Sequence, residues 1–274
     1  MGTPSTSPPR ELLDAWSTSA QAVLDLAQTL DEADLDRPTD LPGWTVRDIV
    51  AHLAHLESEL AGNESVLAGD DAVAADALTD PFRAYTEKGV AARRDRSWSE
   101  LIAELDRAVA ILREALAADP VPDPPADFPR PGTTWEPLLR DRTFDYWMHE
   151  QDIRRAVGRP GGWDSPGAIL TIRVLRASLP FVVGQKVRPS AGTTVGWAVA
   201  GPSGTDELVV RVDDDGRARP CELGVADADA SLSMSAESFV LAGGGRAEPA
   251  SLDVRLGGDT DLAARVLAAM PVTP

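Results

Sequence analysis

The chain has 274 residues, of which 43% are hydrophobic, enough for a packed core in one large or two ordinary domains. Acidic residues outnumber basic ones by 44 to 26, and the net charge of −18 argues against binding to nucleic acid or an anionic membrane through a basic surface. The N-terminus shows no signal-peptide pattern, and no uninterrupted apolar run approaches the roughly 18 residues of a membrane span. We therefore expect a cytoplasmic protein, either a monomer or a homodimer.

Helical patterns dominate the first part of the chain. A Ser-Pro-Pro start signal precedes apolar residues at helical spacing from Leu12 to Leu26. A second helix is expected from Thr45 to about Ala61, because Thr45 is a suitable N-cap and Asp48 lies three positions further on, near the positive helix end. The break between the two contains the stretch "DRPTDLPGW".

Three more helices are predicted in this part of the chain. One begins near Pro81, after the acidic, Ala/Gly-containing stretch "AGDDAVAADALTDP", which has the composition of a mobile segment. The next begins at Ser97 or Ser99, and a Pro-rich stretch follows it that must be extended. The last covers about 136–157 and ends at Gly158.

Beyond Gly162 the pattern changes. A helix is expected over 165–184, and "TTVGWAVAG", "ELVVRVDDDGRARPCEL" and "ASLSMSA" alternate in the manner of strands. Two helical pieces, "AESFVLAGGG" and "DTDLAARVLAAM", close the chain. The predicted architecture is a helical bundle over 1–162 followed by a smaller α+β domain over 163–274.

The chain has three histidines, two of them on the predicted helix that follows Thr45. At about 100° of rotation per residue, His52 falls at the edge of the apolar stripe of this helix, whereas His55 is turned well away from it. We therefore expect His52 to face inward and His55 to be exposed or nearly so.

The third histidine lies in "RTFDYWMHEQDIRRAVGRP", on the helix over 136–157. Asp145, His149 and Asp152 fall within roughly 60° of one another, and bulky apolar residues cover most of the rest of the helix. Such a helix is expected to be substantially buried, although Glu150 points elsewhere and is predicted to face solvent. A buried carboxylate needs a positive partner or a metal, because an isolated buried charge is too costly.

Asp145 and His149 are four residues apart, so their side chains can bind one ion. His52 from a facing helix would give two imidazoles and one carboxylate with an open coordination position, the composition of a catalytic zinc site. The spacing equally allows an ordinary hydrogen-bonded Asp145–His149 pair, with His52 as a boundary histidine. Asp152 could pair with Arg142 or Arg155, or it could orient a metal ligand.

The two elements "LPGWTVRDIVAHLAHLE" and "RTFDYWMHEQDIRRAVGRPGGW" resemble the mycothiol-dependent maleylpyruvate isomerase family, whose N-terminal domain is a DinB-like metal-binding four-helix bundle. The stretches "LSMSAESFVLAGGG" and "VRLGGDTDLAARVLAAM" resemble the sterol-carrier-like α+β domain of these proteins. The resemblance places the metal ligands at His52, Asp145 and His149. The family pattern has Glu at the middle ligand, so Asp145 is a departure that shortens the reach by one methylene.

The resemblance implies a divalent cation, most simply Zn²⁺, that holds the sulfur of mycothiol as a thiolate. In an isomerase the thiolate adds to a cis double bond, the resulting single bond rotates, and elimination leaves the trans isomer. Asp152 and Arg154 are the predicted catalytic residues, and Arg211 or Arg219 could also hold substrate carboxylates. No residues that bind mycothiol are predicted, and an S-transferase acting on another electrophile is equally compatible.

Two alternatives remain open at this level. In the first, the bundle keeps its metal as a structural clip, and the protein binds a ligand or partner without catalysis. In the second, the bundle has lost its metal. The lone Cys221 cannot form an internal disulfide, and we interpret it as a small residue in or near a strand.

Overall fold

A computed structural model of the chain describes residues 8–62, 81–125, 132–201 and 204–273. The chain divides into two compact units, Met1–Leu170 and Thr171–Pro274. The division falls inside helix α7 (Pro166–Phe181). The boundary at residue 162 thus stays a prediction, and the predicted mobile stretch before Pro81 lies almost wholly outside the described residues.

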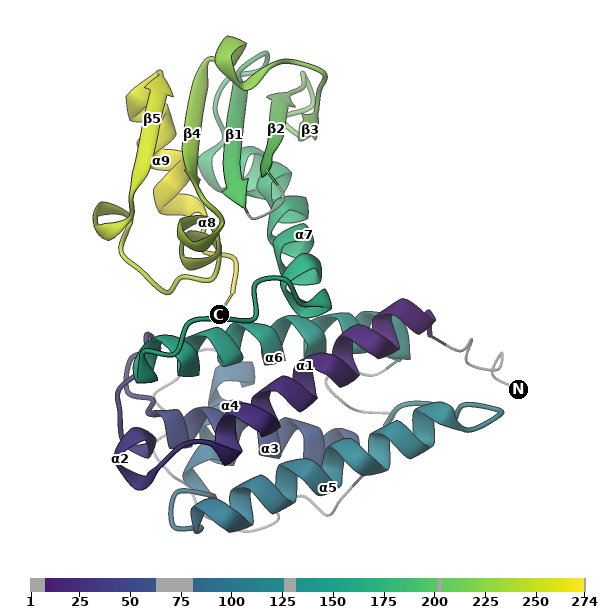
Figure 1. Cartoon of the computed structure of the whole chain (residues 1–274). Coiled ribbons are helices and arrows are strands. Elements are labelled where there is room, and N and C mark those ends of the chain that lie inside the picture. The colour runs from purple at the N-terminus through teal and green to yellow at the C-terminus, as the bar shows by residue number, and fades with distance from the viewer. Residues whose placement is uncertain (1–7, 63–80, 126–131, 202–203, 274) are drawn as a thin grey trace. The chain divides into compact units, whose positions relative to one another are not determined.

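The first unit is the predicted helical bundle (Figure 1). Helices α1 and α3 each pack against both α5 and α6, which makes these four the bundle, and α4 packs against α3. The elements of this unit before α7 are α1 (Arg10–Gln28), α2 (Glu32–Leu35), α3 (Val46–Leu60), α4 (Pro81–Ala91), α5 (Trp98–Ala117) and α6 (Trp135–Val157).

The ends of these helices follow local chemistry. The Thr45 side chain accepts a hydrogen bond from the Asp48 backbone N–H, and the Asp48 carboxylate accepts one from the Thr45 backbone N–H, so both residues satisfy otherwise unpaired amides. Ser97 forms the same reciprocal cap at α5, which resolves the choice between Ser97 and Ser99. Gly158 ends α6 in the left-handed conformation at φ 66°, as predicted from its position.

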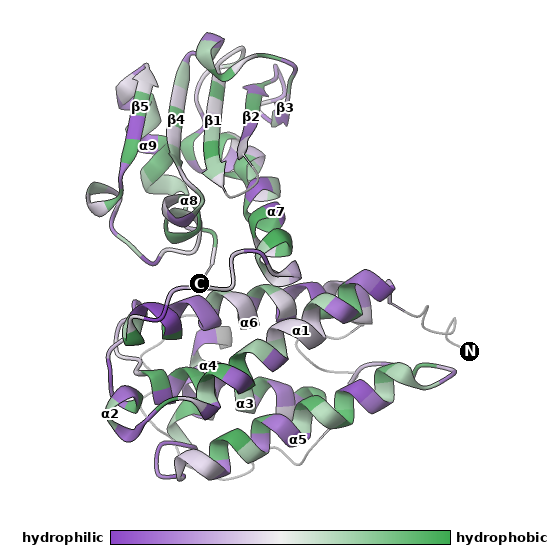
Figure 2. Cartoon of the chain, in the orientation of Figure 1, coloured by the Kyte–Doolittle hydropathy of each residue, from purple (hydrophilic) through white to green (hydrophobic). Residues whose placement is uncertain are grey.

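Helix α3 lies in the middle of the unit, between α4, α5 and α6. Thirteen of its fifteen residues are buried, and these include polar ones. In Figure 2, hydrophobic and hydrophilic colours alternate along α1 and α5, whose hydrophobic side chains pack on α3 and α6 to form the core. The position of α3 explains why the single apolar stripe in its sequence understates its burial.

The second unit is an α+β domain whose strands form one sheet in the order β3-β2-β1-β4-β5. Neighbouring strands are antiparallel except β1 and β4, which run parallel. The strands are β1 (Thr194–Gly201), β2 (Gly204–Val212), β3 (Ala218–Pro220), β4 (Ala230–Ser235) and β5 (Val254–Gly258). Helices α8 (Ala236–Gly243) and α9 (Thr260–Ala269) pack on β4, with α8 also touching β1 and α9 touching β5. The predicted α+β class is confirmed; β5 is an additional strand.

Helix α7 continues into a π-helical turn, Val182–Val187. Within the described residues, Pro166–Val187 is long and apolar enough to cross a membrane when only length and composition are considered, and 44% of its most apolar window is buried inside the protein. A core helix passes the same test, so this is weak support for a membrane span.

Candidate metal centre

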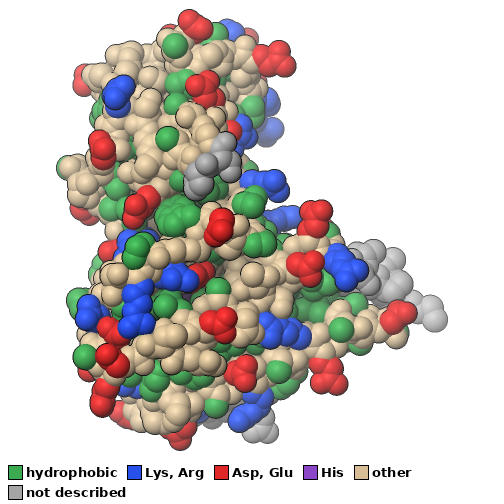
Figure 3. All heavy atoms as spheres, in the orientation of Figure 1, with side chains coloured by type: hydrophobic (Ala, Val, Ile, Leu, Met, Phe, Trp, Pro, Cys, Tyr) green, Lys and Arg blue, Asp and Glu red, His purple; other side chains and the backbone are tan. Residues whose placement is uncertain are grey.

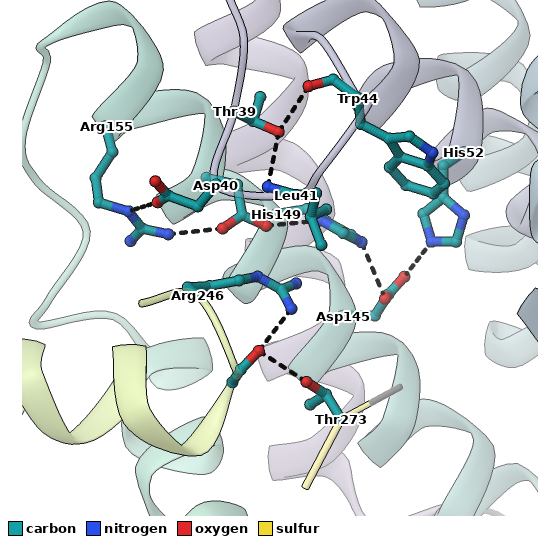
Figure 4. Close-up of polar contacts among 12 residues, drawn as sticks. Thr39, Asp40, Leu41, Trp44, His52, Asp145, His149, Arg155, Arg246 and Thr273 are labelled. Atoms are coloured by element: carbon teal, nitrogen blue, oxygen red, sulfur yellow. Dashed lines mark hydrogen bonds and ion pairs between the residues drawn. The ribbon is translucent and has the colours of Figure 1, made fainter. Parts of the chain in front are cut away.

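Helices α3 and α6 bring three possible metal ligands together (Figure 4). Nε2 of His52 lies 3.4 Å from Oδ2 of Asp145, and Nε2 of His149 lies 3.3 Å from Oδ1 of the same carboxylate. One ligand atom from each residue lies within 4.8 Å of the others. The two α6 residues are one helical turn apart, as their spacing predicts, and α3 supplies the third from across the bundle.

The burial of the three side chains fits a cation. His52 and His149 are each 4% exposed, and no histidine is visible on the face drawn in Figure 3. Within the described part of the chain, neither ring nitrogen of His52 makes a hydrogen bond. A buried imidazole without hydrogen bonds is costly, and a cation that accepts its lone pair would remove that cost. The Asp145 side chain is 27% exposed, so the cluster has a side open to solvent.

Behind His149, a chain of charged groups fixes the ring. Oδ2 of the fully buried Asp152 lies 3.0 Å from Nδ1 of His149, and Oδ1 accepts a 2.6 Å hydrogen bond from Arg155. Arg155 also donates to Asp40. If Asp152 accepts the Nδ1 proton, Nε2 keeps its lone pair facing Asp145, which is the usual arrangement around a metal-binding histidine.

Trp44 covers the two imidazoles. The centroid of its ring lies 5.0 Å from that of His52 and 6.2 Å from that of His149. A turn fixes the tryptophan, in which the Thr39 hydroxyl donates to the Trp44 carbonyl and accepts from the Leu41 amide. The indole N–H donates to Glu87 of α4. The "LPGW" stretch of the sequence therefore forms one wall of the cluster.

Comparisons with known proteins identify the family of the chain. The family model of the mycothiol maleylpyruvate isomerase N-terminal domain matches residues 6–154, which is more than half of the chain. The chain belongs to this family. No curated protein sequence matches it.

The fold also resembles solved structures. A crystal structure of the mycothiol-dependent maleylpyruvate isomerase is similar over 90% of this chain and 92% of that chain, at 15% identity and a TM-score of 0.54. A variant of that isomerase with one histidine replaced by alanine is similar over 86% and 89% of the two chains, at 15% identity and a TM-score of 0.50. A sterol carrier protein 2 like 2 from Aedes aegypti covers 36% of this chain at 20% identity, but its TM-score of 0.26 is too low to support an argument. The first two matches extend the shared fold across both units.

In this member of the maleylpyruvate isomerase family, the charges around the cluster favour metal ligation. Burial lowers the pKa of His52, so its imidazole is neutral and its lone pair is available. Burial acts to raise the pKa of Asp145, but His149, His52 and Arg142 outweigh it and hold that pKa well below its usual range. The pKa of His149 is raised, because Asp145 and Asp152 outweigh its burial. Metal binding at His149 would therefore release a proton.

Two residues on the inner side of Asp145 were not predicted as part of the site. Nη1 of Arg142 donates to Oδ2 of Asp145 at 2.6 Å, and Nε of Arg142 donates to Glu57 of α3 at 3.0 Å. Both residues are buried. The stretch "AHLAHLESEL" contains two carboxylates, Glu57 and Glu59. They were a signal in the sequence, because a buried helix carries an acidic residue only where a partner is present.

The structure places the remaining predicted residues elsewhere. Arg154 pairs with Glu150 at 2.7 Å and donates to the Arg159 carbonyl, so within the described contacts it is not joined to the cluster. The prediction that Glu150 faces solvent is wrong: it is 1% exposed, beneath the loop that contains Gly162. In the second unit, Arg219 pairs with Asp213 and Asp215, and Arg211 lies on β2. Cys221 is a free cysteine directly after β3.

The prediction that His55 is exposed is also wrong. His55 has no exposed surface, and its ring lies 4.7 Å from that of Tyr85 on α4, measured between centroids. Gly89 of α4 lies so close that a Cβ at this position would overlap the His55 ring. His55 is buried because α4 covers the side of α3 that the apolar stripe leaves bare.

Proposed function

We propose that this protein is a metal-dependent enzyme that uses mycothiol as a thiol co-substrate, either to isomerise a cis double bond or to transfer the thiol to an electrophile. The observation that carries the proposal is the His52, Asp145 and His149 cluster, in which neither buried ring nitrogen of His52 makes a hydrogen bond within the described residues, in a chain of the maleylpyruvate isomerase family. Two imidazoles and one carboxylate suit Zn²⁺, and three protein ligands leave a coordination position open.

A divalent cation bound by these residues would keep the mycothiol sulfur as a thiolate at neutral pH, because coordination strongly lowers the pKa of a thiol. The residues of the chain hold the ligands and shape their surroundings. Asp152 orients His149, Trp44 covers both imidazoles, and the exposed edge of Asp145 gives access from solvent. No nucleophilic cysteine of the chain is required.

In the isomerase version, the thiolate adds to one carbon of the cis double bond and a proton reaches the other. Rotation about the new single bond and loss of the same proton and thiolate give the trans isomer, so mycothiol is regenerated. In the S-transfer version the carbon–sulfur bond persists and mycothiol is consumed. We further propose Arg154 as a residue that holds a substrate carboxylate.

Metal analysis of the purified protein tests the site. We expect about one equivalent of a divalent metal in the natural chain and its loss in His52→Ala and His149→Ala. His55→Phe is the matched control, because His55 is a buried histidine of the same helix outside the cluster. A metal-free natural chain, or equal metal content in all variants, would contradict the proposal.

A thiol assay tests the enzyme. Mycothiol is supplied with maleylpyruvate or with a panel of electrophiles, and isomer formation and thiol loss are followed separately. Turnover by the metal-loaded protein that disappears in His149→Ala supports the proposal. Metal binding without any turnover would instead support the non-enzymatic binding protein.

A further inference from the structure

Asp145 is held from its inner side by a buried pair, Glu57 and Arg142, which we call the Glu57–Arg142 arm. Arg142 lies one turn before Asp145 on α6, and its guanidinium bridges the Asp145 carboxylate and the Glu57 carboxylate of α3. Trp16 of α1 donates its indole N–H to the other oxygen of Glu57 at 3.0 Å. The arm thus ties Asp145 to three helices of the bundle.

The contacts of the arm divide the two oxygens of Asp145 between different tasks. Oδ2 accepts the 2.6 Å bond from Arg142, which is short and charge-assisted, and lies 3.4 Å from Nε2 of His52. Within the described contacts, Oδ1 has no bond to Arg142 and faces Nε2 of His149 at 3.3 Å. An aspartate at a partly open position could otherwise turn its carboxylate toward water. The guanidinium opposes that rotation and leaves Oδ1 available for a cation.

Stability alone does not account for the arm. The side chains of Arg142 and Glu57 are 5% and 0% exposed, and taking two charges out of water costs about as much as their attraction returns. Well-packed apolar residues of similar size would serve the bundle equally well.

When ionised, Glu57, Arg142 and Asp145 together carry one negative charge in excess, which a divalent cation would convert into one positive charge. That balance suits a single monoanionic ligand such as a thiolate.

We propose that Arg142, itself oriented by Glu57, is a positioning residue for the metal centre: it fixes Asp145 as a one-oxygen ligand and sets the metal affinity. The inference rests on the proposed metal site and assigns the arm no contact with metal or substrate. It also gives the short aspartate at this position a rigid support, since every contact that holds it comes from a buried group.

The decisive experiment separates positioning from packing. Arg142→Met is combined with Glu57→Leu, so that the whole arm becomes apolar and no buried charge is left unpaired. Zn²⁺ affinity is measured by competition with a chelator, the absorption spectrum of the Co²⁺-substituted protein reports coordination geometry, and urea unfolding reports stability. Arg140→Gln is the matched control, because Arg140 lies on the same helix in an exposed pair with Glu136.

We expect the double variant to fold with near-natural stability, to bind Zn²⁺ about 10- to 100-fold more weakly than the natural chain and to show an altered Co²⁺ spectrum. Arg140→Gln should change neither the Zn²⁺ affinity nor the Co²⁺ spectrum. If the double variant does not fold, Arg142→Lys takes its place, because lysine keeps the positive charge and loses the planar guanidinium that donates to two carboxylates at once. This variant is expected to weaken Zn²⁺ binding by less than the loss expected for the double variant and to alter the Co²⁺ spectrum in the same direction. If a folded variant of the Glu57–Arg142 arm has the Zn²⁺ affinity and the Co²⁺ spectrum of the natural chain, the role of Arg142 is overturned and the proposed metal site still stands. If His149→Ala binds metal as well as the natural chain does, the metal site itself fails and the inference with it.

Discussion

The buried His55 should make the helical unit sensitive to acid. Burial, with Arg93 and His52 nearby, lowers the pKa of His55 from 6.5 to about 3. The folded protein therefore binds a proton at this ring only near pH 3, whereas the unfolded chain binds it below about pH 6.5. The contribution of His55 to stability is complete above pH 6.5 and is lost progressively as the pH falls toward 3.

The size of the effect follows from the difference between the two pKa values. Each pH unit below 6.5 costs about 1.4 kcal/mol, so acidification from pH 7 to pH 5 should remove about 2 kcal/mol of unfolding free energy through His55 alone. His55→Phe removes the titration and keeps a planar ring. It also removes two ring nitrogens that have no hydrogen-bond partner within the described residues. The variant should therefore be about as stable as the natural chain at pH 7.

Urea unfolding followed by tryptophan fluorescence can measure this, because six of the seven tryptophans lie in the first unit. Measurements at pH 7 and pH 5 in the presence of a chelator exclude metal effects, and His52 and His149 titrate in both proteins, so they cancel in the comparison. The natural chain should lose about 2 kcal/mol more than His55→Phe. Equal losses in the two proteins would refute the buried, neutral state of His55. A second variant, His55→Leu, should show the same reduced pH dependence even if it is less stable.

Three further predictions concern other parts of the first unit. Asp152→Asn should weaken Zn²⁺ binding about 10- to 100-fold in chelator competition, because a neutral amide oxygen replaces the charged acceptor of His149, and an unchanged affinity would remove Asp152 from the site. Thr45→Ala should lower the unfolding free energy by about 1 kcal/mol in urea titrations, through loss of the α3 cap; a neutral effect would contradict its role. Gly89→Ala should cost about 1–3 kcal/mol by overlap with His55. His55→Ala in the same chain should recover part of that cost in a double-mutant cycle, and strict additivity would argue against the contact.

Local sequence patterns correctly predicted most helices and strands. The Thr45 and Ser97 caps, the αL position of Gly158 and the alternation in "TTVGWAVAG" each depend on a few neighbouring residues, and such signals are present in the sequence. The same holds for Asp145 and His149, because a four-residue spacing on a helix places two side chains on one face regardless of what surrounds them.

The sequence by itself thus determined most of the elements and the Asp145–His149 pair and, by resemblance, the family and His52 as the third ligand. Only the tertiary structure decided which groups meet across helices: His52 with Asp145, Glu57 with Arg142, and α4 with the far side of α3, where it buries His55. Glu150 was misjudged for the same reason, since its cover comes from a loop that follows α6. Periodicity reports one apolar face of a helix, whereas burial depends on every neighbour that packs around it, and those neighbours are fixed by the fold of the whole unit.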